Sequence, residues 1–151
     1  MLRRVDHVAL AVSDLGASIE HYQRVWGLTL SHREVVAEQG VEEAMFRLGD
    51  TYLQLVAPLS PDTPVGRFIE RRGEGLHHIA YEVEGIEAAL ASAREHELVL
   101  VDQEPRRGSR NTRVAFVHPR TNHGVLVELV EIPLKIPPEI PPDPADPASI
   151  P

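Results

Sequence analysis

Two histidines occupy matching positions in two similar stretches of this chain. Residues 4–12 read RVDHVALAV, and residues 75–83 read GLHHIAYEV. Aligning the two stretches places His7 on His78, which follows it by 71 residues. One histidine on a strand is usually structural, but two at equivalent positions of a repeat suggest a shared role in binding a metal ion.

The same repeat pairs an amide with a carboxylate. The segment YLQLV (52–56) aligns with LVELV (126–130), so Gln54 falls on Glu128 at an offset of 74 residues. A carboxylate inside so apolar a strand is costly to bury unless it meets a cation or the face is wet. Gln54 is less demanding, because an ordinary hydrogen bond within the sheet would satisfy its amide.

Two imidazoles, one carboxylate and one amide oxygen make a nitrogen and oxygen donor set. Such a set suits Co²⁺, Mn²⁺, Ni²⁺, Zn²⁺ or Fe²⁺. Four protein ligands leave two octahedral positions open, which a substrate with two oxygens could fill. His77 is the competing ligand, but choosing it would shift the alignment by one residue and turn the side chain to the opposite face. We therefore prefer His78.

Coordination of two substrate oxygens polarises a carbonyl and stabilises an enolate, and the reaction then needs a base for the carbon-bound proton. Inverting a stereocentre needs two such groups, one on each face. Glu43 is a candidate, because strand alternation places it on one face with Met45 and Arg47. The alternative for Glu43 is an exposed carboxylate paired with Arg47 or Arg33.

The hydrophobic periodicity predicts the same order of elements in both halves of the chain. Each half reads β-α-β-β-β, in modules of about 4–57 and 75–131, with a connector at 58–74. The expected first-half elements are a strand at 5–12, a helix capped by Ser13 or Asp14 and running to about Trp26, and strands at 28–33, 43–48 and 51–57. The connector carries a short helix at 64–71. The second half has a strand at 76–83, a helix at 86–96, and strands at 99–101, 113–118 and 124–131.

The composition limits the remaining possibilities. With 151 residues, 42% hydrophobic and 25% charged, the chain predicts one domain or two small fused halves, here residues 1–131. A net charge of −8 argues against nucleic-acid binding, and the absence of cysteine excludes disulfides. No apolar run reaches membrane-spanning length, and the N-terminus lacks a secretory signal, so we expect a cytoplasmic protein.

Two further segments stand out. Residues 132–151 are rich in proline and acidic, which is typical of an extended tail without a catalytic role. Arg106, Arg107, Arg110 and Arg113 form the densest basic cluster, which could be a solvated loop or a contact for a phosphate group.

These motifs resemble those of the vicinal oxygen chelate superfamily, and within it the methylmalonyl-CoA epimerase family. The superfamily resemblance lies in DHVA (6–9) and LHHIA (76–80). The narrower one lies in EQGV (38–41), LVAPL (55–59), GEGLHHIA (73–80), DQEPR (102–106), and HP (118–119) followed by GVLVEL (124–129).

The resemblance implies an α+β fold of tandem βαβββ modules that form a cup-shaped mixed sheet, the glyoxalase/bleomycin-resistance-like fold. It implies the metal ligands His7, Gln54, His78 and Glu128, which the repeat also indicates. It further implies one divalent ion per chain, Co²⁺ before Mn²⁺, Ni²⁺ or Zn²⁺, an acyl-CoA substrate and a homodimer.

The expected reaction is interconversion of (2R)- and (2S)-methylmalonyl-CoA. Glu43 and Glu128 would flank the α-carbon, with Glu128 acting through its non-ligating oxygen. Three alternatives share the cup: a glyoxalase-type lactoylglutathione lyase, a non-catalytic small-molecule-binding protein, and a ring-cleaving iron dioxygenase. The binding proteins generally lack the ligand set, and a fourth ligand disfavours the dioxygenase.

Overall fold

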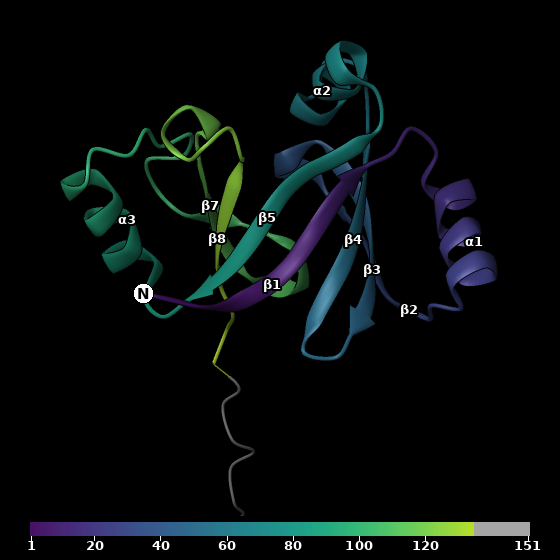
Figure 1. Ribbon diagram of the computed structural model, residues 1–151, viewed down its shortest axis with the longest axis horizontal. Coiled ribbons are helices and arrows are strands. Elements are labelled where there is room, and N and C mark those ends of the chain that lie inside the picture. The colour runs from purple at the N-terminus through teal and green to yellow at the C-terminus, as the bar shows by residue number, and fades with distance from the viewer. Residues whose placement is uncertain (135–151) are drawn as a thin grey trace, which may run out of the picture.

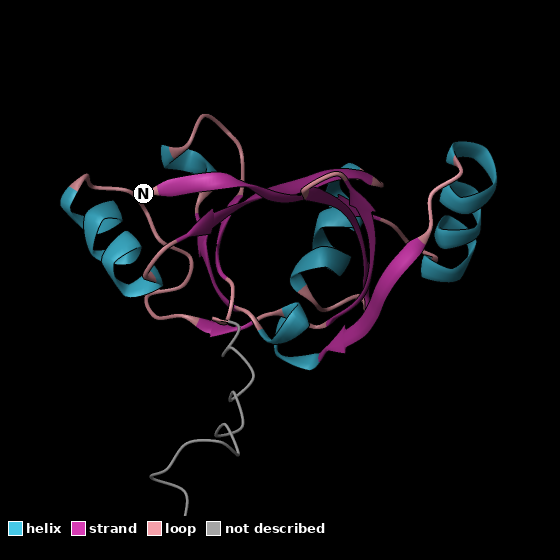
Figure 2. Cartoon of the chain, turned by 90° about the horizontal axis from the view of Figure 1, so that it is seen from below, coloured by secondary structure: helices cyan, strands magenta, loops and turns pink. Residues whose placement is uncertain are grey.

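One mixed β-sheet organises the molecule, and it curls into an open half-barrel (Figures 1 and 2). The structure is a computed structural model that describes residues 1–134; the rest of the predicted tail, 135–151, lies outside the described residues. The eight strands run in the order β2-β3-β4-β1-β5-β8-β7-β6. Their bounds are β1 Leu2–Ala11, β2 Leu30–Val36, β3 Val41–Leu48, β4 Thr51–Pro58, β5 Gly75–Val83, β6 Arg106–Arg107, β7 Arg113–Val117 and β8 Val127–Glu131.

The two halves of the sheet are related by their pairing pattern. Strands β1 and β5 are antiparallel neighbours at the centre. On its outer side each has a parallel partner from its own half, β4 for β1 and β8 for β5. The predicted α+β cup of mixed strands is therefore confirmed.

Helix α1 (Leu15–Trp26) begins and ends where the sequence predicts. The Asp14 side chain caps it by accepting from the Ala17 amide at 3.0 Å, and Gly27 ends it in the left-handed conformation at φ 65°. Leu15 and Ile19 pack into a core cluster with Phe46 and other residues of β3 and β4. The first half thus has its own core.

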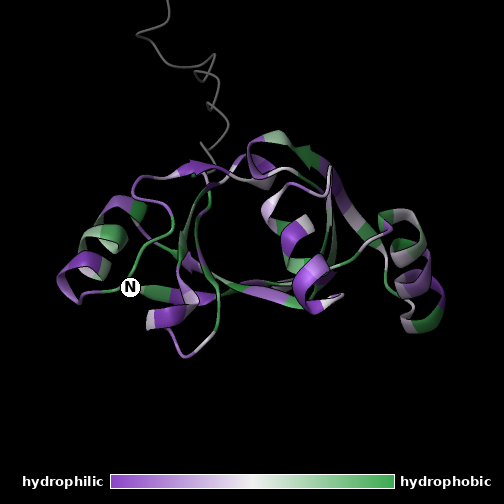
Figure 3. Cartoon of the chain, turned by 90° about the horizontal axis from the view of Figure 1, so that it is seen from above, coloured by the Kyte–Doolittle hydropathy of each residue, from purple (hydrophilic) through white to green (hydrophobic). Residues whose placement is uncertain are grey.

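Helix α3 (Ile86–Glu95) builds the second core at the opposite end of the molecule (Figure 1). Ile86 and Leu90 are fully buried against β7 and β8. The hydropathy colouring shows that α1 and α3 each carry polar and apolar residues (Figure 3). No glycine follows α3, and Glu97 instead adopts the left-handed φ of 59°.

Helix α2 (Pro64–Arg72) lies in the connector, capped by Thr63. Val65 packs into a third cluster with Ala11 and Val56. The first turn of α2 lies close to the preceding loop at Gly66, because a Cβ there would lie 2.6 Å from the carbonyl oxygens of Ser60 and Pro61. Within residues 1–134, no helix is both long and apolar enough to cross a membrane.

The predicted strand at 99–101 is wrong. Leu100 forms only an isolated bridge with Val117, and the edge strand is β6, in the arginine-rich segment. A short 3₁₀ turn at Pro119–Thr121 precedes β8, which begins at Val127 rather than at the predicted residue 124. Neither difference alters the register of the residues discussed below.

Candidate metal centre and active site

Three predicted ligands converge at the centre of the sheet. The Nε2 atoms of His7 and His78 lie 3.1 Å apart, and each lies 3.0 Å from Oε2 of Glu128. All three residues are buried. They form a group whose ligand atoms are close enough to hold one metal ion.

The strand register explains this convergence. On β1 and β5, His7 pairs with Ala80 and Ala9 pairs with His78, so each imidazole stands beside a small residue. Glu128 also pairs with Ala80.

Gln54 occupies the equivalent place in the first half, because it pairs with Ala9 on the other side of β1. Its side chain is buried, and its amide nitrogen donates to Oε2 of Glu43. Within residues 1–134 its Oε1 has no hydrogen-bond partner. A buried amide oxygen without a donor fits a cation, so the residues present match the predicted donor set.

Asp6 contacts the Nδ1 side of the His7 ring. The sequence did not predict this role for Asp6. Its Oδ2 lies 2.7 Å from Nδ1 of His7, an arrangement that orients the imidazole so that Nε2 faces His78 and Glu128. Strand alternation would put neighbouring residues on opposite faces. The pairing of β1 with β5 is irregular between Val5 and His7, and such an irregularity re-aims side chains.

Arg110 completes this arrangement from the other half of the chain. Its guanidinium pairs with Asp6 and lies 4.8 Å from the ring centre of Tyr52. Burial would raise the pKa of Asp6, but the hydrogen bond to His7 and the charge of Arg110 hold it below the usual value. Asp6 therefore stays ionised behind the ligand.

The ionisation of the central residues follows from their contacts. Burial alone would raise the pKa of Glu128, but hydrogen bonds from His7 and His78 hold it well below the usual value. Burial alone would lower the pKa of His7, whereas hydrogen bonds to Asp6 and Glu128 raise it to about 9. Glu128 is therefore a carboxylate anion at the centre of the site.

Glu43 is buried, contrary to the alternative of an exposed strand carboxylate, and is only 3% exposed. One carboxylate oxygen accepts from Gln54. The other, Oε1, is buried and has no partner among the described residues. Burial raises the pKa of Glu43 to about 7. The side chain thus combines a fixed position with a free oxygen, as a general base requires.

His77 does not belong to the group of converging ligand atoms. Its ring packs edge-on against Phe68 of α2, with ring centres 4.8 Å apart. Its Nδ1 lies 2.8 Å from Nδ1 of His78.

Two cavities open beside His78. One of about 130 Å³ is lined mainly by apolar side chains, among them Val41, Val65 and Phe116. The other, of about 440 Å³, lies between α2 and the segment before β8, and Arg71, Arg72 and His118 line it. Both have His77, His78 and Leu126 in their walls.

The arginine cluster does not form one basic patch. Arg110 pairs with Asp6, and Arg113 lies 2.8 Å from Glu131. Arg106 lies 3.3 Å from Asp102. Acidic partners therefore take up much of the charge that the sequence suggested for a phosphate.

Comparisons with known proteins identify the family of this chain. The sequence profile of the Glyoxalase/Bleomycin resistance protein/Dioxygenase superfamily matches residues 6–116. The ethylmalonyl-CoA/methylmalonyl-CoA epimerase of Cereibacter sphaeroides is 36% identical over 134 residues, which cover 87% of this chain and 100% of that protein. The human mitochondrial methylmalonyl-CoA epimerase is 35% identical over 129 residues, covering 85% of this chain and 73% of that protein.

A solved structure is similar as well. A methylmalonyl-CoA epimerase in complex with methylmalonyl-CoA and NH4+ superposes with a TM-score of 0.85 and 42% sequence identity, over 87% of this chain and 95% of that chain. The chain therefore belongs to the Glyoxalase/Bleomycin resistance protein/Dioxygenase superfamily and, within it, to the methylmalonyl-CoA epimerases, a family of isomerases.

Proposed function

We propose that this protein interconverts (2R)- and (2S)-methylmalonyl-CoA by removing the α-proton on one face and returning a proton on the other. The names of its relatives support the substrate. The observation that carries the reaction type is Glu43, a buried carboxylate with one oxygen fixed by Gln54 and the other free.

His7, His78, Glu128 and Gln54 would hold one divalent ion, with Co²⁺ expected before Mn²⁺, Ni²⁺ or Zn²⁺. When bound, such an ion supplies a Lewis acid that stabilises negative charge on the thioester and carboxylate oxygens of the substrate. Asp6 and Arg110 fix the imidazole of His7 for this task.

Glu43 is the proposed base. The Gln54 amide donates to Oε2 of Glu43, which leaves Oε1 to accept the α-proton. Because Gln54 also offers its own free oxygen to the cation, it ties the position of the base to that of the metal. The side chain of Ser109 is buried nearby and favours the ionised form of Glu43.

Glu128 is the proposed acid on the opposite face. Its Oε2 faces both histidines, so its second oxygen must carry the proton. Because the reaction is reversible, Glu128 must return the proton in one direction and remove it in the other, and ligation weakens it as a base in the second of these roles.

The 440 Å³ cavity is the proposed site for the CoA portion of the substrate. It adjoins His78, and Arg71, Arg72 and His118 offer hydrogen-bond donors of the kind that phosphate groups bind. The 130 Å³ apolar cavity would take the acyl end. We also propose that the protein is cytoplasmic and forms a homodimer. Sedimentation of the pure protein would test the dimer.

A solvent-exchange measurement tests the reaction. The cobalt-loaded protein is mixed with (2R)-methylmalonyl-CoA in D₂O, and the α-hydrogen is followed by NMR together with the appearance of the 2S form. We expect deuterium at the α-carbon of both epimers. When a chelator removes the metal, we expect neither deuterium exchange nor formation of the 2S form. Failure of the loaded protein to exchange the α-hydrogen would refute the proposal, as would turnover of a glutathione hemithioacetal instead.

A further inference from the structure

A second group of potential metal ligands lies between β2 and β3, next to the site described above. His32, Glu34 and Glu43 each place one ligand atom within 4.8 Å of the others. Strand pairing creates this group, because Glu34 and Glu43 are direct cross-strand partners in the antiparallel register. His32 lies two residues before Glu34 on the same strand, so their side chains share a face.

This pairing is electrostatically unfavourable by itself. Two carboxylates directly opposite each other on antiparallel strands repel. Here one of them, Glu43, is only 3% exposed, so water screens the repulsion poorly. A positive charge between the two strands would remove this cost.

Two polar atoms of the group have no hydrogen-bond partner within the described part of the chain. They are Oε1 of Glu43 and Nε2 of His32, and both atoms are buried. The His32 atom lies 3.6 Å from Oε2 of Glu34, too far for a good hydrogen bond but suitable for two ligands of one ion. The free oxygen of Glu43 and the free nitrogen of His32 point to a ligand shared with Glu34.

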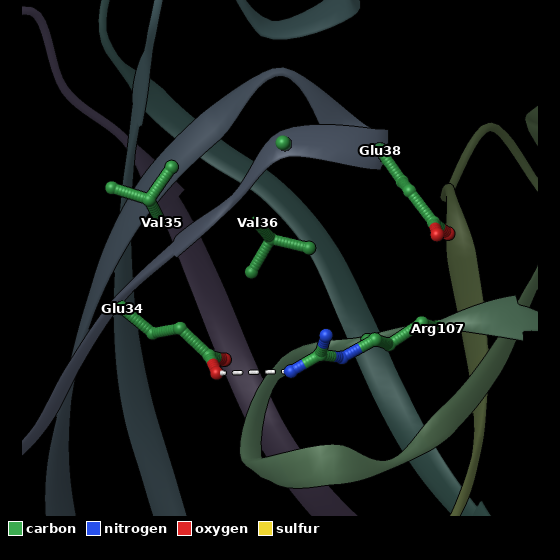
Figure 4. A pocket seen from close by; sticks show the side chains of 7 residues that line it. Glu34, Val35, Val36, Glu38 and Arg107 are labelled. Atoms are coloured by element: carbon green, nitrogen blue, oxygen red, sulfur yellow. Dashed lines mark ion pairs between the residues drawn. The ribbon is translucent and has the colours of Figure 1, made fainter.

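Within the described residues, the neighbouring Arg107 and Arg110 contact Glu34 and neither Glu43 nor His32. Figure 4 shows Arg107 pointing toward Glu34 across a pocket. A guanidinium nitrogen of Arg107 lies 3.9 Å from Oε1 of Glu34. The backbone amide of Arg110 donates to Oε2 of Glu34 at 3.2 Å. These contacts hold Glu34 in place and leave Glu43 and His32 available.

We propose that His32, Glu34 and Glu43 form a second divalent-cation site of the Zn²⁺ class, separate from the site at His7, His78 and Glu128. One imidazole and two carboxylates are ordinary zinc ligands, whereas Mg²⁺ and Ca²⁺ prefer oxygen donors alone. An ion there occupies the free oxygen of Glu43. If the proposed function holds, the second zinc ion therefore inhibits the epimerase by withdrawing its base.

Zinc stoichiometry tests the site without reference to activity. The full-length chain, stripped of metal, is dialysed against increasing Zn²⁺, and bound zinc is measured by elemental analysis. We expect two ions per chain, the second binding more weakly. His32→Ala and the nearly isosteric Glu34→Gln should each weaken the second ion by about tenfold or more and keep the first. His78→Ala should lose the first and keep the second.

His21→Ala is the matched control, because His21 is an exposed histidine on α1, and it should leave both ions bound. In the cobalt-loaded wild-type enzyme, excess Zn²⁺ should slow epimerisation. The His32→Ala variant should epimerise at the wild-type rate without Zn²⁺, and excess Zn²⁺ should not slow it. A single zinc ion at all concentrations would overturn the site, as would a second ion that both variants retain. A second ion that leaves the epimerisation rate unchanged would overturn its contact with Glu43.

Discussion

At the scale of single residues, the site depends on a chain of contacts that crosses between the two halves of the protein. Arg110 of the second half pairs with Asp6 of the first, and Asp6 lies 2.7 Å from the proposed ligand His7. A fully buried carboxylate needs such partners, and it gives the imidazole both its orientation and its basicity.

Replacing Asp6 by Asn keeps the shape of the side chain but removes the charge behind His7. We expect the affinity for Co²⁺ to fall about 10- to 100-fold. Competition with a coloured chelator measures this, and Asp62→Asn, at an exposed position, serves as the control. An affinity within twofold of the wild type, in a variant that still melts cooperatively, would show that Asp6 does not support the metal.

Replacing Glu43 by Gln removes the proposed base but none of the four proposed ligands. The turnover number should fall about 10²- to 10⁴-fold, because a general base typically contributes that much. The cobalt content at one equivalent of metal should not change. Glu42→Gln is the control, since Glu42 lies 2.8 Å from Arg33 on the strand's other face. Retained turnover in Glu43→Gln would remove Glu43 from the mechanism.

The repeat predicted which side chains meet, because equivalent residues of two duplicated strands must occupy equivalent places. His7 and His78 meet for this reason, and Glu128 joins them. Asp6 and His32 could not be found in the same way. Asp6 depends on an irregularity in strand pairing, and His32 depends on a cross-strand neighbour that only the register reveals.

At the scale of elements, local sequence signals determine the helices well. Asp14 and Gly27 bound α1 as predicted, because capping depends on residues next to the helix. The edge of the sheet was less predictable. The segment at 99–101 has strand-like residues but forms one bridge, while Arg106 and Arg107 pair with β7. Tertiary pairing overrides β-propensity at such positions.

The cap of α1 gives a stability prediction. Asp14→Ala removes the acceptor for the Ala17 amide and should cost about 1 kcal/mol. For a chain of this size, the melting temperature should drop by about 2–4 °C. Ser13→Ala is the matched control, because among residues 1–134 Ser13 forms a hydrogen bond through its backbone amide, to Glu74, and none through its hydroxyl. Equal melting temperatures of the two variants would contradict the cap assignment.

At the scale of the whole molecule, each half has a core of its own, but the proposed metal site belongs to both. The first half supplies His7 and Gln54, and the second supplies His78 and Glu128. The antiparallel pair of β1 and β5 is the element that joins them. A cation bound there should therefore stabilise the two halves together.

This linkage predicts that metal raises stability. At a free Co²⁺ concentration 100 times the dissociation constant, the free energy of unfolding should increase by about 2.7 kcal/mol. Thermal melts with cobalt and with a chelator measure the change. His78→Ala should abolish it, and wild-type melting temperatures that do not depend on cobalt would contradict a site in the folded state.

The most direct test of the account is the position of the bound ion. Anomalous diffraction from crystals of the chain loaded with one equivalent of Co²⁺ locates it without assumptions about activity. We expect a single strong peak enclosed by His7, Gln54, His78 and Glu128, beside the free oxygen of Glu43. A cobalt peak elsewhere, with none among these four side chains, would contradict it.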